Sequence, residues 1–540
     1  MRIIRKSSGR KQAVISKSVT IKDYKLSAFC IEEHTSEGVL LCHTATGEIL
    51  LLTNEEYREL SSGKELTSNW ARIMADRLFL VSTAQDEYAM VDRDRHAASR
   101  EKTRNIPVTS YTILPTSQCN ARCFYCYEKD IPQKNMSAQI AIDTADFIAQ
   151  HCCGEKVHIT WFGGEPTVAH PVISLICKRL DDRGVEYSSG MISNGLLLDE
   201  AMIQTAIVCW RLEHIQITID GTEKIYNETK NYKGTIPNPF EVVLTNIRHL
   251  LKNNIRISIR INLGQHNYDD VVQLIHLLDR RFLEKKLLSI YVHTIDNVYD
   301  EEIHGELIEK SFELNQLLIT LGMHSPGELP SLRLHSCMAD SDDALLINPD
   351  GQLGKCEHYA FDKQIGSIYS EERNESVIAE WKEKAAYEFC SRCPLYASCF
   401  QLKWCNGGLP CSESAVKSKI ASIRSSMRMV YIQWKQKCQR MRTDLVFALN
   451  GTIDVRLEAG AIYADFYENK NQQIRETRQL NSVACTILRF LQDAHSFQDI
   501  AVLLMESYSG DSDFIGQILE DYLLEFLHDG LIISQIKENA

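Results

Sequence analysis

Six short runs of apolar and β-branched residues alternate with amphipathic stretches through the middle of the chain. This alternation constrains the fold more than any other feature. The runs are SYTIL, VHITW, EYSSGMIS, LEHIQITI, IRISIRINL and KLLSIYVHTI, and segments such as AQIAIDTADFIAQHC and FEVVLTNIRHLLKNN lie between them. Strands that alternate with helices predict a parallel sheet. The sequence therefore predicts an α/β fold, with a partial (β/α)6, TIM-like barrel over residues 106–325.

Four of these runs end in residues that are unusual for a strand. Cysteines follow the first run, Gly-Gly-Glu-Pro the second, Ser-Asn-Gly the third and Asp-Gly the fourth. Taken alone, Gly-Gly-Glu-Pro or Asp-Gly is most often a simple turn. In barrels of this kind, however, the chemistry gathers at the C-terminal ends of the strands. The shared position of the motifs therefore favours one functional site.

The composition excludes several classes of protein. The chain has 540 residues, of which 44% are hydrophobic, and this is typical of a globular protein with several domains. A net charge of −13 argues against a general nucleic-acid binder. The basic start is not followed by the apolar stretch of a signal peptide, and no run approaches the roughly 18 apolar residues of a membrane span. We therefore expect a cytoplasmic protein without nucleic-acid or membrane partners.

The 18 cysteines are distributed unevenly along the chain. Three lie in TSQCNARCFYCYEKD (116–130), and seven lie between residues 337 and 411. Such clustering indicates metal sites, and the residues alone allow either iron–sulfur clusters or structural zinc. The scattered cysteines, which we interpret as small core residues, are Cys30, Cys42, Cys152, Cys153, Cys177, Cys209, Cys438 and Cys485.

The spacing Cys-x3-Cys-x2-Cys after the first strand of a βα series resembles the radical S-adenosylmethionine superfamily. The resemblance implies that Cys119, Cys123 and Cys126 hold three irons of a [4Fe–4S] cluster. Three thiolates where four are normal leave one iron open, and the resemblance places S-adenosylmethionine on that iron. It further implies reductive cleavage to a 5′-deoxyadenosyl radical, with an electron donor such as flavodoxin or ferredoxin.

The same resemblance assigns further residues to S-adenosylmethionine. The Gly-Gly-Glu-Pro motif would meet the methionine amino group through its backbone; its residues are Gly163, Gly164, Glu165 and Pro166. The other expected contacts are Ser193 and Asn194 with the carboxylate or ribose, Lys230 with the carboxylate where relatives often carry arginine, Tyr125 near the adenine, and Asn262 with the ribose. The sequence singles out no catalytic base, although Asp296 and His293 near the sixth strand end are candidates.

The second group of cysteines resembles the SPASM domain, a twin-cluster extension of radical enzymes that modify peptides, over residues 326–412. A hairpin turn at Pro349-Asp350-Gly351 would deliver Cys356, and CSRCPLYASC matches the middle motif. The family usually leaves three residues before its next cysteine, whereas this chain leaves five. The expected ligands are Cys337, Cys356 and Cys405 for the first auxiliary cluster, and Cys390, Cys393, Cys399 and Cys411 for the second.

The first auxiliary cluster is one thiolate short in this assignment. A water, a substrate group or Cys438 would complete it. A pair of structural zinc sites is the alternative interpretation of these cysteines.

The C-terminal end of the chain indicates a function more clearly than the N-terminal end does. Residues 445–540 read as short strands followed by three helices, and they resemble the winged-helix-like, PqqD-like leader-binding domain of ribosomal peptide biosynthesis. In that family a leader peptide adds as a strand to a sheet edge. Winged helical domains more often read DNA, but the acidic helices argue against this. We expect a linking helix over 413–444 and, over 1–105, a β-rich scaffold or leader-contact domain.

Together these features predict a radical enzyme with three [4Fe–4S] clusters and S-adenosylmethionine. It would oxidise a ribosomally made precursor peptide, forming a thioether or carbon–carbon crosslink. Two alternatives remain open. One is a maturase of the anaerobic sulfatase-activating type, which forms formylglycine. The other is a non-catalytic, metal-stabilised peptide-binding protein.

Overall fold

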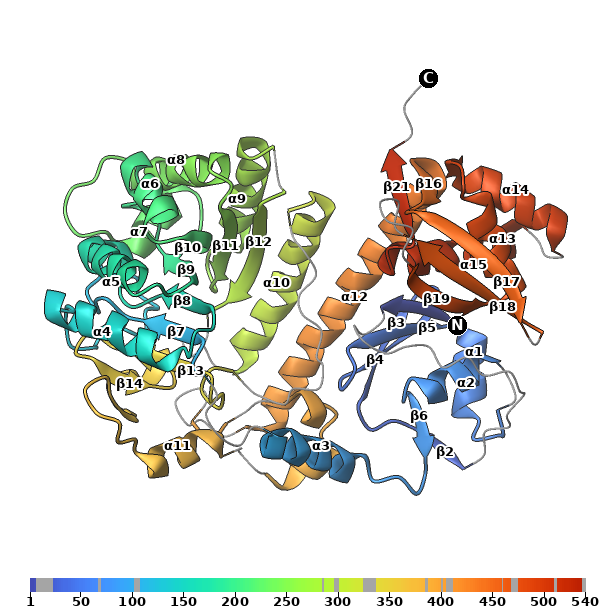
Figure 1. The fold of residues 1–540 in the computed structure, drawn as a ribbon, viewed down its shortest axis with the longest axis horizontal. Coiled ribbons are helices and arrows are strands. Elements are labelled where there is room, and N and C mark those ends of the chain that lie inside the picture. The colour runs from blue at the N-terminus through green and yellow to red at the C-terminus, as the bar shows by residue number, and fades with distance from the viewer. Residues whose placement is uncertain are drawn as a thin grey trace.

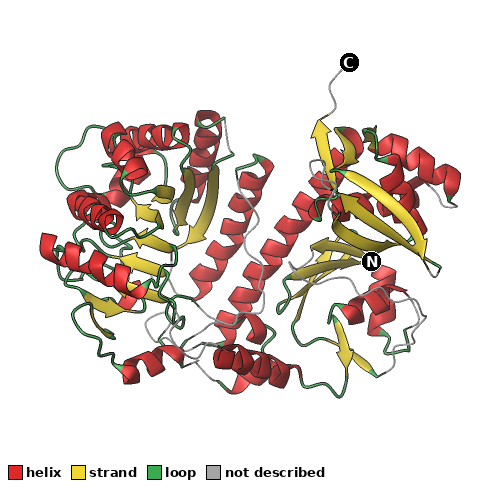
Figure 2. Ribbon diagram, in the orientation of Figure 1, coloured by secondary structure: helices red, strands yellow, loops and turns green. Residues whose placement is uncertain are grey.

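The computed structural model describes most of the chain, and Figures 1 and 2 show its arrangement. The described residues are 1–5, 23–66, 69–101, 107–283, 286–295, 301–323, 337–383, 387–399, 402–404, 411–458, 460–467, 474–508 and 512–536.

The expected parallel sheet is present. Its strands are β7 (Ser110–Ile113), β8 (Val157–Trp161), β9 (Tyr187–Ser193), β10 (Leu212–Thr218), β11 (Arg256–Leu263) and β12 (Leu288–Thr294). They lie in chain order, and every neighbouring pair is parallel. The helices between them are α4 (Ala138–His151), α5 (His170–Asp182), α6 (Glu200–Val208), α7 (Glu223–Lys230), α8 (Pro239–Lys252) and α9 (Tyr268–Arg281).

The two faces of this sheet differ in polarity, as β11 illustrates. Ile257, Ile259 and Ile261 are buried in the main hydrophobic core with residues of the flanking helices. Arg260 and Asn262 alternate with them and therefore point to the opposite face, because side chains of a strand alternate between its two sides. The face opposite the helices is thus polar, and this is the face that supplies the site.

The sheet continues beyond the six predicted strands. Strand β13 (Ala344–Ile347) pairs in parallel with β7, and β14 (Gln352–Gly354) and β15 (Gly366–Ser367) extend it as antiparallel strands. The turn between β13 and β14 contains Gly351 at φ 77°, a left-handed conformation that suits glycine. The predicted hairpin therefore exists, and it is joined directly to the edge of the barrel sheet.

Near the N-terminus a separate four-stranded sheet has its own core. Its order is β1 (Arg2–Arg5), β5 (Glu48–Leu52), β4 (Gly38–His43) and β3 (Cys30–Thr35). The other elements of this region are α1 (Asn54–Ser61), α2 (Asn69–Asp76), α3 (Glu87–Glu101), β2 (Tyr24–Leu26) and β6 (Leu80–Ser82). Thr53 caps α1 with a capping box that satisfies backbone N–H groups at the start of the helix.

A helix of 31 residues, α12 (Glu413–Thr443), runs along the N-terminal sheet. Its residues Met427, Val430 and Trp434 are buried against that sheet, and it also packs on α10 (Glu301–Thr320). Two of its basic side chains form ion pairs with the N-terminal region. Arg428 lies 3.4 Å from Glu33, and Lys435 is paired with Glu37. The helix is therefore a packed spine as well as a linker.

The C-terminal region has strands followed by three helices, in the expected order. The strands β17 (Thr452–Glu458), β18 (Ala461–Tyr467) and β19 (Ile474–Leu480) form an antiparallel meander. A second small sheet and three helices complete the unit: β16 (Leu445–Leu449), β20 (His495–Ser496), β21 (Ile532–Ile536), α13 (Ser482–Phe490), α14 (Phe497–Ser507) and α15 (Ser512–His528). A capping box of Ser496 and Asp499 starts α14.

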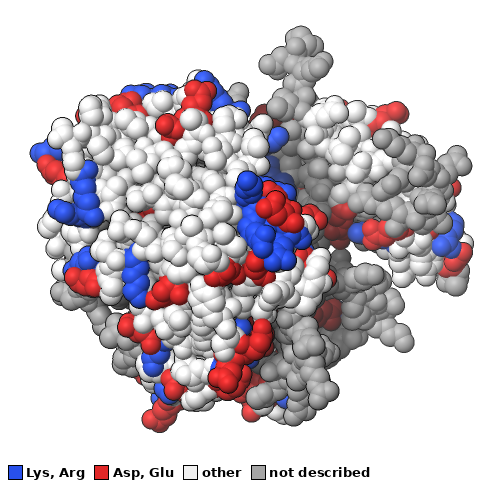
Figure 3. All heavy atoms as spheres, turned by 60° about the vertical axis from the view of Figure 1, so that its left-hand side comes forward, with Lys and Arg blue, Asp and Glu red and all other residues white. Residues whose placement is uncertain are grey.

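The charged residues do not gather in one broad patch of a single sign on the face shown in Figure 3, where basic and acidic side chains lie side by side. Within the part of the chain that the structure describes, none of the helices has the length and apolar character needed to cross a membrane.

Candidate functional site

The first cysteine triad lies on the loop between β7 and α4, as predicted. Cys119, Cys123 and Cys126 are all partly buried. The loop is fastened to the end of α7 and the chain just after it, because the backbone N–H of Arg122 donates to the carbonyl of Lys230 (2.8 Å) and that of Lys233 to the carbonyl of Asn120 (2.8 Å). The three thiols are therefore held on one short, anchored segment.

Burial shapes the chemistry of these thiols. It raises the pKa of Cys119 to about 12, and it also raises the pKa values of Cys123 and Cys126. Charges on Cys123 and Cys126 would raise the pKa of Cys119 further, so the three thiols are near neighbours. Among the described residues, no three Cys, His, Asp or Glu side chains converge closely enough to hold a single metal ion. A cluster of several irons spreads its thiolates more widely than one ion does, and its charge would drive off the thiol protons.

The Gly-Gly-Glu-Pro turn packs backbone to backbone against this loop. A Cβ at Gly163, which has φ 111°, would meet the carbonyl oxygen of Thr116 at 2.3 Å. A Cβ at Gly164 would meet the carbonyl oxygen of Gln118 at 2.4 Å. Both positions require glycine because the neighbouring atoms belong to backbone. Pro166 then begins a short 3-10 helix, Pro166–Ala169.

The side chain of Glu165 organises the end of the next strand. It is buried and accepts hydrogen bonds from the Ser193 hydroxyl (2.8 Å) and from the backbone N–H of Asn194 (2.7 Å). Burial raises the pKa of Glu165, although these hydrogen bonds oppose the shift. Ser193 was predicted to face the cofactor, but its hydroxyl donates a hydrogen bond to Glu165.

Asn194 lies beside an unsatisfied polar group. Its side-chain amide donates to the Asn120 side-chain oxygen at 2.6 Å. The Asn120 amide nitrogen is buried and has no hydrogen-bond partner in the described structure. A buried amide without a partner costs free energy, so a polar ligand beside the cysteine loop would satisfy it. The sequence analysis did not single out Asn120, and its only signal was its position between the cysteines.

Lys230 is the centre of a buried ion pair that we call the rim pair. Its ammonium lies 3.0 Å from the carboxylate of Asp220, and both side chains are almost fully buried. The Tyr125 hydroxyl donates to the same carboxylate at 2.8 Å. Burial alone would lower the pKa of Lys230, but the charge of Asp220 together with those of Tyr125 and other neighbours outweighs it, and the net shift is upward. Tyr125 and Lys230, both predicted contacts of the cofactor, thus converge on Asp220, which the sequence analysis noted only as part of the Asp-Gly motif at a strand end.

The cysteine loop, the Gly-Gly-Glu-Pro turn and the rim pair together form the candidate site. Residues 113–278 match the family model of the Radical SAM superfamily. The matched span contains the cysteine loop, the Gly-Gly-Glu-Pro turn and the rim pair. Residues 113–278 form a radical SAM domain.

Three known proteins show how far the similarity extends. GTP 3',8-cyclase of Clostridium perfringens (strain SM101 / Type A) is 25% identical over 303 residues, which cover 51% of this chain and 88% of the cyclase. The cysteine-type anaerobic sulfatase-maturating enzyme of Clostridium novyi (strain NT) is 24% identical over 336 residues, or 54% of this chain and 86% of that enzyme. The solved structure of native anSMEcpe with bound AdoMet has a TM-score of 0.49 and 16% identity, and it covers 61% of this chain and 100% of that one.

The residues of the radical SAM domain fit the groups that its family implies, a [4Fe–4S] cluster and S-adenosylmethionine. Three thiols on one loop suit three irons, the glycine turn packs closely against that loop, and the orphaned Asn120 amide offers a donor. When bound, these groups supply one-electron reductive chemistry that ends in hydrogen abstraction. The chain's own part is to orient Glu165, Asn194 and the rim pair around that position.

The predicted residues on β11 and β12 lie on the polar face of the radical SAM domain. Asn262 is buried, and its side-chain oxygen accepts from Arg260 Nε at 2.8 Å. His293 Nδ1 lies 3.2 Å from Arg260 Nη2, so Arg260 links Asn262 to His293. Asp296, the other candidate base, falls outside the described residues.

The structure brings together one of the two predicted auxiliary sets. Charges on Cys390, Cys399 and Cys411 would each raise the pKa of Cys393, after the larger effect of burial, so these four thiols are near neighbours. Of the other set, Cys337 is exposed, Cys356 follows β14, and Cys405 falls outside the described residues.

Two of the scattered cysteines have different surroundings. Cys438 lies far along α12, buried in the core that this helix forms with the N-terminal sheet, as expected of a core cysteine. At about 1.5 Å of rise per residue, the helix carries it roughly 35–40 Å from the segment of Cys411. Cys153 corrects the sequence analysis, because it is exposed and has φ 52°, so it is a turn residue and not part of the core.

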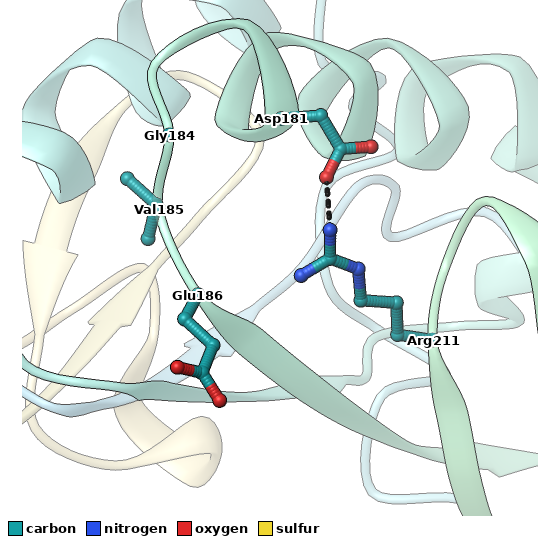
Figure 4. Close-up of a pocket in the computed structure, with 5 residues that line it drawn as sticks. All are labelled: Asp181, Gly184, Val185, Glu186 and Arg211. Atoms are coloured by element: carbon teal, nitrogen blue, oxygen red, sulfur yellow. Dashed lines mark hydrogen bonds and ion pairs between the residues drawn. The ribbon is translucent and has the colours of Figure 1, made fainter.

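A pocket of about 360 Å³ lies near the start of β9, at the opposite end of that strand from Ser193. In Figure 4 the side chains of Asp181 and Arg211 point toward each other across it, 2.6 Å apart. Because the two charges compensate each other and the cysteine loop is at the other end of the sheet, this pocket is not the candidate site.

Proposed function

We propose that this chain is a radical SAM enzyme that modifies a ribosomally made precursor peptide. The observation that carries the proposal is the combination, in one chain, of the radical SAM domain with a separate C-terminal unit of strands and helices. In the described residues the outer strands of that unit, β17 and β19, each pair only with β18. Each therefore offers a row of backbone groups that an extended peptide could extend as a further strand.

The auxiliary cysteines support an oxidative outcome. Four neighbouring thiols suit a further [4Fe–4S] cluster, and with Cys337, Cys356 and Cys405 the chain holds enough thiols for three clusters in all. Additional clusters would accept the electron that remains after hydrogen abstraction from the peptide. A net two-electron oxidation, such as a thioether or carbon–carbon crosslink, follows from this electron count. An enzyme of this kind would need an electron donor such as flavodoxin or ferredoxin.

The radical chemistry is tested with the cysteine loop. Anaerobically reconstituted protein should hold about twelve irons and form deoxyadenosine from S-adenosylmethionine. The triple variant Cys119→Ala/Cys123→Ala/Cys126→Ala should form none and should keep the iron bound by the auxiliary cysteines. Zinc at the C-terminal cysteines, or deoxyadenosine from the triple variant, would contradict the proposal. Unchanged GTP in a parallel incubation would separate this enzyme from the related cyclase.

Peptide capture is tested by hydrogen exchange on the full chain. The peptide encoded by a short reading frame beside the gene should protect amides of β17 or β19. The N-terminal sheet, whose outer strands are β1 and β3, provides an internal control with edges of the same kind. Protection there and not in the C-terminal unit would move leader recognition to the N-terminal region. Mass spectrometry of the product then distinguishes a loss of two hydrogens, expected for a crosslink, from conversion of a cysteine to formylglycine.

A further inference from the structure

Arg260 is a cation on the polar face of the barrel whose charge no described carboxylate compensates. It lies on β11, level with Thr218 of β10 and Tyr291 of β12. Both neighbours are uncharged, and the Tyr291 hydroxyl donates to the side-chain oxygen of Gln216 at 2.8 Å. Its side chain is only partly buried, so a ligand on this face can reach it.

The hydrogen bonds of Arg260 leave most of its guanidinium unused. Nε donates to Asn262, and Nη2 lies 3.2 Å from His293 Nδ1. That Nδ1 also lies 2.6 Å from the carbonyl oxygen of Thr294. One nitrogen cannot accept from Arg260 and donate to Thr294 at once, so at most two of the five guanidinium N–H groups are engaged within the described structure.

The contrast with Lys230 decides what Arg260 can do. Lys230 was the expected partner of a carboxylate, but Asp220 already neutralises it in the rim pair. Arg260 keeps a planar fork of donors, which matches the two oxygens of a carboxylate. Its contacts with Asn262 and His293 direct that fork toward the C-terminal ends of the strands, where the cysteine loop lies.

We propose that Arg260 binds the carboxylate of a ligand held on the polar face of the barrel. This proposal rests on the proposed function, which offers two sources of a carboxylate. One is the methionine moiety of S-adenosylmethionine, and the other is an acidic side chain of the peptide. In either case the ligand supplies the negative charge that the described residues around Arg260 lack.

The test measures binding, not turnover, on the anaerobically reconstituted full chain. The variants are Arg260→Gln, which keeps a donor to Asn262 but removes the charge, and Arg260→Lys, which keeps the charge but loses the fork. Ser258→Ala is the matched control, because Ser258 lies on the same strand and the same face, one alternation earlier. Iron content and thermal melting show whether each variant has folded.

Two pairs of probes distinguish the sources. The first pair is S-adenosylmethionine and its decarboxylated analogue, measured by calorimetry. The second pair is acetyl-Ala-Glu-Ala-amide and its Gln counterpart, measured by saturation-transfer NMR. If the cofactor supplies the carboxylate, Arg260→Gln should weaken S-adenosylmethionine about 10- to 100-fold and leave the analogue unchanged. If the peptide supplies it, only the signal of the Glu tripeptide should fall. Arg260→Lys should be intermediate, and Ser258→Ala should match the original chain.

Equal binding of all four probes by the original chain and by folded Arg260→Gln would overturn the assignment. An equal loss for a charged probe and its neutral counterpart would also overturn it, since Arg260 would then shape the site without binding a carboxylate. Failure of the proposed function has a different signature. In that case the chain forms no deoxyadenosine, whereas the binding measurements still report on Arg260.

Discussion

Two groups of buried charge in this molecule are built in opposite ways. The rim pair, Asp220 and Lys230, lies within one domain, and both side chains are at most 3% exposed. The second group, which we call the terminal cluster, consists of Arg2, Arg442, Glu520 and Asp521. Arg2 donates to Glu520 across 518 positions of sequence, and Arg442 of α12 binds the same carboxylate.

The two groups differ in how far solvent reaches them and in which parts of the molecule they hold in place. In the terminal cluster Glu520 is buried, but the side chains of Arg442 and Asp521 are 41% and 45% exposed. Water therefore screens part of that cluster, whereas it is excluded from the rim pair. We infer that the rim pair fixes the geometry of the site and that the terminal cluster fastens β1, α12 and α15 to one another.

The largest effect is expected at the rim pair. Lys230→Met leaves the buried Asp220 carboxylate without its cationic partner, which should lower the free energy of unfolding by about 3–5 kcal/mol. Urea denaturation measures the loss. Lys224→Met on the same helix is the control, because Lys224 is exposed and forms no ion pair with any residue that the structure describes. Replacing both partners, as Lys230→Met/Asp220→Leu, should recover part of the loss. A single variant as stable as the control would show that water reaches Asp220.

The two groups also show what a sequence can reveal. The six barrel strands, the cysteine loop and the polar strand ends were predicted because each leaves a local pattern of period or spacing. Asp220 and Lys230 were both visible as strand-end and helix residues, yet their pairing was missed because a resemblance assigned Lys230 to a ligand. The local pattern located Asp220 and Lys230, but only the fold shows that their charges are already paired with each other.

Contacts between distant segments leave no such pattern. Nothing in the local sequence indicated that β13 would extend the barrel sheet beside β7 or that β1 would dock on the C-terminal unit. The same holds for α12, which was expected only as a linking helix and whose Arg428 and Lys435 lie beside Glu33 and Glu37 of the N-terminal region. Arg260 was likewise overlooked, because its lack of a carboxylate partner is a property of the assembled sheet.

A smaller effect is expected at the terminal cluster. Glu520→Gln removes the charge that Arg2 and Arg442 share, and should cost about 2 kcal/mol. Because Arg2 keeps Asp521 at 3.1 Å, the domains should stay docked while β1 opens more often. Hydrogen exchange at β1 should therefore quicken, and exchange at β9 in the barrel should not change. Glu506→Gln on the neighbouring α14, an exposed position, is the control. Faster exchange in both strands would mean that the terminal cluster and the barrel are coupled.

The smallest effect should come from an ion pair that belongs to neither group and lies on the barrel's outer surface. Asp146 of α4 accepts from Arg179 Nε (2.7 Å) and Nη2 (2.9 Å) and from Arg183 Nε (2.8 Å), and these hydrogen bonds hold its pKa well below the usual value. Its side chain is 23% exposed, so screening limits the contribution, and Asp146→Asn should cost about 1 kcal/mol at neutral pH.

Because the pKa of Asp146 is lowered in the folded state, the stabilisation is complete above the unfolded-state pKa near 4 and declines as the pH falls toward the folded value. The melting temperatures of the original chain and of Asp146→Asn should therefore differ at pH 7 and converge below about pH 4. Asp182→Asn, at the exposed end of α5, should follow the original chain throughout. A gap that stays constant between pH 7 and pH 3 would show that Asp146 acts through packing and not through its charge.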